Sequence, residues 1–381
     1  MNQKSQRDQA HIRTLDGLRG CAALAVTMFH GILHFNVSLI PRVLYAPAQS
    51  LSDGTDIWVK FLLAIFNGDS AVILFFVLSG YVLGASLDRT LDRGEPALVT
   101  SIEFLVKRVA RIYPAMFFCM LVYMLLSFVF VPHIEYPVIS PITAFQSATL
   151  YDIGVHGPSW SLLVEVVAAP FVVAFVLLRR TFGFFALVLA IGYAMLAIDY
   201  PVLVGSLPNL WPYLVSFGIG VALSSPEFKA IDFDVKPTHL AISIVLFVFA
   251  RHFVARGNIS GLIVHSFLAG LVVFTASRAY RGLAYKFLIS RPVQFLGRIS
   301  YSFYLLNVPI LYAVWGTILI INPHPEKHYL LWGVGSALVT TILTLPLAVF
   351  SERFIERPGI FFISSLIRRV NNLRKSLAHA S

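Results

Sequence analysis

The sequence is poor in charge and almost without cysteine. Charged residues make up 13% of its 381 positions, and its two cysteines, Cys21 and Cys119, both lie within apolar runs. Two cysteines in such surroundings support neither a disulfide framework nor a zinc site. Hydrophobic residues account for 57% of the chain, which excludes an ordinary soluble domain and indicates a protein that crosses a membrane several times.

Several signatures of soluble enzymes and repeat proteins are absent as well. The chain has no Walker, Rossmann, HExxH or GxSxG pattern, no repeat with a period of about 20 to 50 residues, and no Gly/Ser-rich or Pro-rich linker. We therefore expect neither a metal site nor a permanently bound cofactor. The polar first fifteen residues lack an apolar stretch followed by a cleavage site, so we also expect no removable signal peptide.

Ten apolar stretches are long enough, or nearly so, to cross about 30 Å of hydrocarbon as helices of about 20 residues. The sixth is short and contains Pro212. A further segment, Trp58 to Phe66, is too short to span and predicts an interfacial or re-entrant helix. We predict an all-α, polytopic membrane bundle of about ten transmembrane helices, near residues 15–35, 70–87, 112–132, 159–178, 182–199, 208–224, 238–255, 260–277, 299–321 and 330–350.

The stretches divide the chain into one membrane domain and two tails. We expect the membrane domain to cover residues 15–358, after a cytoplasmic tail at 1–14. Residues 359–381 are both apolar and basic. Such a composition is typical of an amphipathic helix that lies on an anionic inner leaflet. We therefore expect the C-terminal tail to anchor the protein rather than to take part in its chemistry.

The basic residues are unevenly distributed between alternate loops. If the N-terminus is cytoplasmic, 24 of the 29 lysines and arginines fall on the cytoplasmic side of the predicted bundle. Such an asymmetry predicts that both termini are cytoplasmic. It also explains the formal net charge of +10 without a nucleic-acid partner, because the charge serves to orient the chain in the bilayer.

The first apolar stretch carries ionisable residues. Arg19 and His30 are eleven residues apart, so a helix places them on one face about 16 Å from each other. An ionisable group in a spanning helix costs about 3 kcal/mol and usually faces the bundle interior or a wet cavity. Two readings stay open at this point: an interfacial arginine with a packing histidine, or a pair of functional residues.

Two further clusters of charged residues could carry chemistry. Arg108 and Arg111 are three apart on one helical face at the membrane surface, where they could clamp phosphates or merely anchor the span. Glu165 lies inside an apolar run, one turn after Ser161. It is either a functional carboxylate or the structural partner of a buried basic group.

The ninth stretch carries a polar stripe. Ser300, Tyr304 and Asn307 follow one another at i, i+4 and i+7, so they lie along one side of a helix. Such a stripe lines a cavity or supplies hydrogen bonds between helices.

At this point six short motifs carry a resemblance. In order, the chain contains LDGLRG, FFVLSGY, KRVARIYP, WSLLVE, GRISYSFYLL and IERP. From about residue 13 to 358, these motifs resemble those of the acyltransferase 3 family of integral membrane acyltransferases. The resemblance implies ten core helices in the bacterial cytoplasmic (inner) membrane, acetyl-CoA as the usual donor, and a hydroxyl of a cell-envelope or exported sugar as acceptor.

The resemblance also implies roles for individual residues. The family's arginine and histidine match Arg19 and His30, and its cytoplasmic arginine motif matches Arg108 and Arg111; we assign Tyr113 of the same motif to donor binding as well. Many members carry a histidine where this chain has Asn307, and asparagine cannot shuttle a proton. The chain also lacks the hydrolase-like extension of some members, so its membrane domain must complete the transfer itself.

These roles combine into one expected mechanism. Arg108 and Arg111 hold the phosphates of an acyl-CoA donor, and Arg19 holds another polar part of it. His30 acts as general base or acyl carrier, and Glu165 orients it as in a catalytic triad. The remaining polar residues, Ser161, Tyr304 and Asn307, contact the substrates, and Ser161 or Asn307 could stabilise an oxyanion.

A different class of function stays open beside this mechanism. Arg19, His30 and Glu165 could instead form the proton relay of a transporter, or the chain could be a flippase of lipid-linked sugars, with no covalent chemistry in either case. The expected partners of the acyltransferase are acyl-CoA, a carbohydrate or glycolipid acceptor, and the lipid bilayer.

Overall fold

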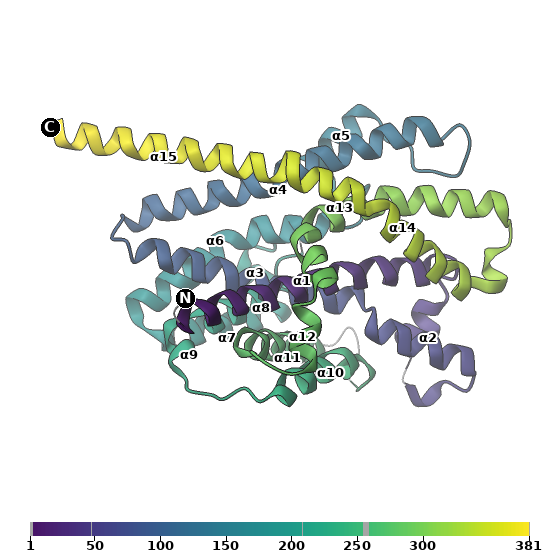
Figure 1. Ribbon diagram of the computed structural model, residues 1–381, viewed down its shortest axis with the longest axis horizontal. Helices are drawn as coiled ribbons and strands as arrows, with labels where there is room; N and C mark the ends of the chain where they lie inside the picture. The colour runs from purple at the N-terminus through teal and green to yellow at the C-terminus, as the bar shows by residue number, and fades with distance from the viewer. Residues whose placement is uncertain (1–2, 47, 208, 254–258, 381) are drawn as a thin grey trace.

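The computed structural model describes residues 3–46, 48–207, 209–253 and 259–380. Over these ranges the chain is built of helices and connecting turns, with no β-strand (Figure 1). The predicted all-α class is therefore confirmed. The helices are α1 (Gln3–His34), α2 (Gly54–Ile65), α3 (Gly68–Leu91), α4 (Ala97–Phe130), α5 (Pro141–Ala148), α6 (Ser159–Phe182), α7 (Phe184–Asp199), α8 (Leu214–Ser224), α9 (Pro226–Ala230), α10 (Pro237–Phe253), α11 (Ile259–Arg278), α12 (Leu283–Leu288), α13 (Arg291–Ile321), α14 (Tyr329–Ser351) and α15 (Arg357–Ala380).

Each predicted apolar stretch falls on one of these helices. Six helical segments of the described chain are long and apolar enough to cross a membrane. Three shorter apolar helices, Phe184–Asp199, Leu214–Ser224 and Pro237–Ala250, lie between them in the sequence. The protein is therefore a multi-pass membrane protein. The number of about ten crossings stays a prediction.

The sixth predicted stretch begins later than expected. Residues 209–213 form turns, and helix α8 starts only at Leu214. Asn209 has a left-handed backbone with φ of +57°, and Pro212 has no amide hydrogen to donate to a helical hydrogen bond. These two residues shorten the helix by several positions at its start.

The segment Trp58 to Phe66 is helical, as predicted, up to Ile65, where α2 ends, and Phe66 is the C-cap. The carboxylate of Asp53 caps this helix by accepting a hydrogen bond of 2.9 Å from the amide of Thr55. The buried Nζ of Lys60 donates to the carbonyl oxygen atoms of Val43 and Ala46 at 3.0 and 2.6 Å. Lys60 thus ties α2 to the preceding segment. The interfacial position of α2 stays a prediction.

Helix α1 runs through the middle of the bundle (Figure 1). It packs against α13, α14 and α3 along most of its apolar length. A Cβ atom on Gly20 would lie 2.6 Å from the backbone nitrogen of Gly297 in α13. Because both positions are glycine, the two backbones can approach this closely. The central helix is therefore held in a fixed register against α13.

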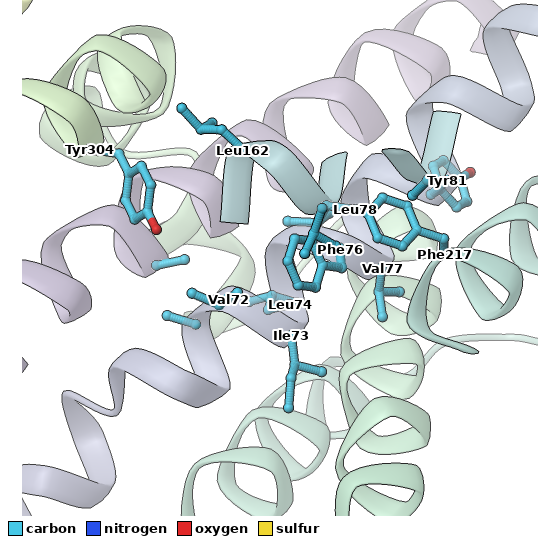
Figure 2. Packing of buried hydrophobic residues seen from close by; sticks show 14 of the residues in the cluster. Val72, Ile73, Leu74, Phe76, Val77, Leu78, Tyr81, Leu162, Phe217 and Tyr304 are labelled. Atoms are coloured by element: carbon cyan, nitrogen blue, oxygen red, sulfur yellow. The ribbon is translucent and has the colours of Figure 1, made fainter. Parts of the chain in front are cut away.

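Helix α3 supplies much of the remaining core. Phe76 stacks on Phe217 of α8 with ring centroids 5.0 Å apart. Figure 2 shows these rings among Val72, Leu74 and other buried side chains, with Tyr304 of α13 at one side of the cluster. Glycines again allow close contact, since a Cβ atom on Gly220 would meet the backbone of α3. The bundle thus buries α3 as well as α1.

The C-terminal tail is a long helix, α15, that packs along α4. A Cβ atom on Gly359 would lie 3.1 Å from the ring of Pro114, and Asn371 donates a hydrogen bond of 2.5 Å to Glu103. The two helices therefore run antiparallel, as Figure 1 shows. The predicted helical tail is present, and its place on a membrane leaflet stays a prediction.

Candidate active site

Three arginines meet one glutamate in a hollow between α1, α3, α4, α6 and α13. We call this hollow the arginine pocket. Six of the residues predicted from the sequence line it, together with Val72, Phe75, Phe76, Ile112, Leu162, Ser300 and Tyr301; the six are Arg19, Arg108, Arg111, Ser161, Glu165 and Tyr304. Segments far apart in the sequence thus place their polar side chains at one point of an otherwise apolar bundle.

Arg108 is the buried centre of this pocket. Its Nη2 donates to the carboxylate of Glu165 and to the hydroxyl of Ser79 at 3.1 Å. An unpaired guanidinium at such a place would be strongly destabilising, whereas a paired and hydrogen-bonded one is tolerated. Arg108 therefore ties α4 to α6 and α3. The hydrogen bond from Arg108 to Ser79 was not predicted from the sequence.

Arg19 and Arg111 differ from Arg108 because they have no hydrogen bond or ion pair with any residue that the structure describes. Arg19 and Arg111 lie near each other and near Glu165. The charges of Arg111 and Glu165 both act on Arg19. Asp16 and Glu356 also act on these arginines, but neither carboxylate lines the pocket. Among the lining residues, positive charge is therefore in excess.

Apart from apolar side chains, the pocket wall contains hydroxyl groups, and three of these, on Ser161, Tyr301 and Tyr304, already have hydrogen-bond partners. The hydroxyl of Ser161 donates to the carbonyl oxygen of Pro158 at 2.9 Å, and it lies 2.9 Å from the hydroxyl of Tyr304. Tyr301 donates to the carbonyl oxygen of Ile112 at 2.8 Å. The enclosed volume is about 40 Å³, which leaves room for only a few water molecules. A larger ligand therefore requires these side chains to move apart.

His30 lies outside the arginine pocket. It is on the same helix as Arg19, eleven residues further along, and its side chain is exposed. The carboxylate that acts on it is that of Asp69. The neighbouring residues are in contact as well, since a Cβ atom on Gly68 would lie 2.8 Å from the ring of Phe29. The start of α3 therefore faces this turn of α1.

The predicted pairing of Glu165 with His30 is wrong. Glu165 is bonded to Arg108 and acts on Arg19, and helix geometry separates Arg19 from His30 by about 16 Å. The carboxylate whose charge acts on His30 is that of Asp69. The available signal was this acidic residue directly before the predicted apolar stretch at 70–87.

His34, one turn beyond His30, joins α1 to α13. Its ring stacks on the indole of Trp315, with centroids 3.3 Å apart and planes 8° from parallel. We call this part of the bundle, with His30 and His34, the histidine end. It is separate from the arginine pocket, and α1 connects the two.

Comparison with known proteins identifies the family of the chain. A family profile described as an acyltransferase domain, Acyl_transf_3, matches residues 12–349. The chain belongs to the acyltransferase 3 family. No curated protein and no solved structure matches the chain. The match covers nearly the whole membrane domain, so the protein is a membrane acyltransferase, and the arginine pocket and the histidine end both lie within its acyltransferase domain.

Besides His30, two predicted residues of this acyltransferase, Tyr113 and Asn307, do not line the arginine pocket. Tyr113 donates to the carbonyl oxygen of Thr149 at 3.4 Å. Asn307 is fully buried, and its Nδ2 donates to the carbonyl oxygens of Phe303 and Tyr304 at 3.1 and 3.0 Å. Its Oδ1 has no hydrogen-bond partner in the described part of the chain. Asn307 is thus satisfied mainly by its own helix, as polar side chains in helix interiors often are.

No group of three or more histidine, cysteine or acidic side chains that could hold a metal occurs among the described residues of this acyltransferase. The expectation of no metal site stays a prediction. The arginine pocket brings together guanidinium groups, the carboxylate of Glu165 and hydroxyls, and the histidine end offers the imidazole of His30, on which the carboxylate of Asp69 acts.

Proposed function

We propose that this membrane acyltransferase moves an acyl group, expected to be acetyl, from acyl-CoA to a hydroxyl of a cell-surface or exported carbohydrate. The observation that carries the proposal is the pair of unpartnered guanidinium groups, Arg19 and Arg111, in the arginine pocket. Unpaired cations within a membrane bundle are costly. The phosphates of coenzyme A can supply the direct hydrogen-bonded partners that Asp16 and Glu356 do not, because guanidinium groups bind phosphate with two parallel hydrogen bonds.

The distance along α1 supports a long donor. Arg19 and His30 are about 16 Å apart along the helix axis, a distance that suits an extended pantetheine arm better than a compact ligand. With its phosphates at the arginine pocket, the donor presents its thioester at the histidine end. The pocket has a volume of only about 40 Å³, so donor binding must widen it. Arg108 and Glu165, which are bonded to each other, are part of the wall that must move.

His30 then supplies the proton transfer. As general base it takes the proton of the acceptor hydroxyl, the hydroxyl oxygen attacks the thioester carbonyl, and the carbon–sulfur bond breaks to release the coenzyme A thiolate. The thiolate takes up the proton, which restores His30. Asp69 is the carboxylate that acts on His30, and we assign it the orienting role first given to Glu165. In a two-step route, His30 carries the acyl group itself.

The proposed orientation has both termini in the cytoplasm of a bacterial cell, with the protein in the cytoplasmic membrane. It rests on the 24 of 29 basic residues that fall on that side. The donor then enters from the cytoplasm at the arginine pocket, and the acceptor reaches the histidine end from the other side.

The experiment that tests the function is release of coenzyme A by the purified protein in liposomes, with acetyl-CoA and a sugar acceptor. We expect release that depends on the acceptor and that falls in Arg111→Ala. Lys107→Ala is the matched control, because Lys107 lies on the same helix and pairs with Glu103 at 3.1 Å outside the pocket. Sugar transport across the membrane with no release of coenzyme A would contradict the proposal and favour a transporter or flippase.

A further inference from the structure

The IERP motif has no part in the proposed function, yet it contains a buried carboxylate. Its glutamate, Glu356, is the last residue of the π-helical turn Glu352–Glu356, which joins α14 to α15. Two residues later, Pro358 has no amide hydrogen to donate to the carbonyl oxygen of Phe354. Helical turns widened in this way frequently occur at functional sites. Glu356 is therefore a buried acidic residue whose role is still open.

Helix α13 holds the carboxylate of Glu356 close to the wall of the arginine pocket. The hydroxyl of Ser302 donates to this carboxylate at 3.2 Å. The residue before Ser302 is Tyr301, which lines the pocket, and the charges of Glu165 and Glu356 both act on Tyr301. The two carboxylates thus lie near the same tyrosine, but only Glu165 is part of the pocket wall.

Helix α4 contacts the same turn from another side. A Cβ atom on Gly359, three residues after Glu356, would lie 3.1 Å from the ring of Pro114 and 3.9 Å from the carbonyl oxygen of Ala110. Pro114 cannot donate to that carbonyl oxygen, so one helical hydrogen bond of α4 is missing there. Arg111 belongs to this turn of α4. The start of α15 therefore packs on the turn that carries an arginine of the pocket.

The charge of Glu356 acts on the pocket without direct contact. Among its charged neighbours Arg111 acts on it most strongly, and Arg19 acts on it as well. Within the described part of the chain, Glu356 forms no ion pair with either arginine. The other glutamate of the turn, Glu352, pairs with Arg357 at 2.5 Å. Because charges in a bundle interior are screened less than in water, Glu356 offsets part of the positive charge that the pocket presents to an anion.

We propose that Glu356 weakens the binding of coenzyme A phosphates at Arg111, so that coenzyme A can leave after the acyl group has been transferred. This inference rests on the proposed function and assigns to its donor site a residue that sets affinity. Acetyl-CoA and coenzyme A carry the same phosphates, so a pocket that used all its positive charge would hold product as tightly as substrate. A fixed carboxylate beside the pocket lowers the affinity for both.

Glu356→Gln tests the proposal, because glutamine removes the charge, keeps the size and can still accept a hydrogen bond from Ser302. We expect the Kd of coenzyme A, measured by calorimetry, to fall about tenfold, which equals about 1.4 kcal/mol. The dissociation rate of labelled coenzyme A should fall by a similar factor, since affinity differences among related complexes are mostly differences in dissociation rate. Loss of a merely structural contact would not tighten binding. An unchanged or weaker affinity would overturn the proposal.

Two further variants separate the charge from the fold. Glu352→Gln is the matched control, because Glu352 is a buried glutamate of the same turn that already has Arg357 as its partner. It should leave the affinity for coenzyme A unchanged. Glu356→Asp keeps the charge and shortens the side chain, so its affinity should stay near the wild-type value. Tightening in Glu356→Asp or in Glu352→Gln as large as in Glu356→Gln would overturn the proposal.

A donor without phosphates gives the second test. S-acetylpantetheine has the thioester and the pantetheine arm but none of the phosphates, so Glu356→Gln should leave its kcat/KM unchanged while the KM for acetyl-CoA falls. An equal change with both donors would show that the effect does not depend on the phosphates and would overturn the proposal. Failure of the proposed function looks different: the unmodified protein would then neither bind coenzyme A nor release it from acetyl-CoA.

Discussion

Arg19 and His30 lie on the same helix, yet their surroundings differ in charge, size and access. Arg19 lines a pocket of about 40 Å³ with three guanidinium groups and one carboxylate in its wall. His30 is exposed, and an apolar hollow of about 710 Å³ between α4, α13 and α14 lies near the same end of α1. Under the proposed function, the end with Arg19 binds an anion and the end with His30 supplies a base.

The first prediction tests whether the two ends of α1 face opposite sides of the membrane, and its result is all or none. Cysteines introduced at Arg93, after α3, and at His324, after α13, should be labelled by an impermeant reagent from opposite sides of the membrane. Both positions are exposed, whereas the native Cys119 is buried and Cys21 is half-buried. Labelling of both from one side would contradict the map, and with it the separate entry of donor and acceptor.

The second prediction concerns the base at the histidine end. His30→Gln keeps hydrogen bonding and approximate size but cannot take up the acceptor proton. We expect donor binding to be nearly unchanged and the transfer rate to fall on the order of 10²-fold or more. Single-turnover transfer in liposomes measures it. A variant that keeps roughly half of the wild-type rate would exclude His30 from the chemistry, since general-base catalysis contributes far more.

The third prediction concerns the arginine pocket. Arg111→Ala should weaken acyl-CoA binding by roughly 1.5 to 3 kcal/mol, the usual contribution of a hydrogen bond to a charged group. Arg111→Lys should restore it only in part, because lysine lacks the planar fork. Arg111 is a cleaner test than Arg108, whose removal would leave Glu165 without its partner. Calorimetry measures the affinity, with Lys107→Ala as the control, and an unchanged donor affinity would return Arg111 to an anchoring role.

Much of the fold could be predicted from the sequence because the bilayer imposes a simple rule. A helix must satisfy its own backbone in hydrocarbon, so each apolar stretch of sufficient length became a helix. The exceptions have local causes, such as Pro212 and the left-handed Asn209 before α8. The apolar hollow between α4, α13 and α14 could not be predicted, because a side chain that faces lipid and one that faces a hollow have the same apolar character in the sequence.

The structure brings six of the predicted site residues into one pocket, but not in the predicted pairing. The high cost of a charge in hydrocarbon singled out Arg19 and Glu165, and the spacing of two arginines on one helical face singled out Arg108. Spacing along one helix does not tell which residues of different helices lie at the same depth. Glu165 was therefore paired with His30 when its partner is Arg108.

The polar stripe on α13 shows the same limit. Ser300 and Tyr304 line the arginine pocket, as one side of a helix should. Asn307 is only one turn further, yet it bonds back to its own helix. The i, i+4, i+7 spacing gives the direction of each residue, but it does not say how far along the helix a pocket extends.

The last prediction decides between the two carboxylates, and its expected effect is the smallest. Asp69 acts on His30 from the start of α3, whereas Glu165 is bonded to Arg108 in the other region. We expect Asp69→Asn to lower the transfer rate roughly tenfold, about 1.5 kcal/mol, as for the loss of one hydrogen bond to a charged group. Donor affinity should stay unchanged, because Asp69 does not line the arginine pocket.

The double variant separates an orienting role from a merely structural one. If Asp69 acts only through His30, then Asp69→Asn with His30→Gln should transfer little more slowly than His30→Gln alone, because the two residues act as one unit. Glu165→Gln should behave differently and weaken donor binding through Arg108. Single-turnover rates and calorimetry on the same preparations give both readouts. If the double variant instead lost the product of the two single losses in transfer rate, Asp69 would act independently of His30. The proposed orienting role of Asp69 would then be wrong.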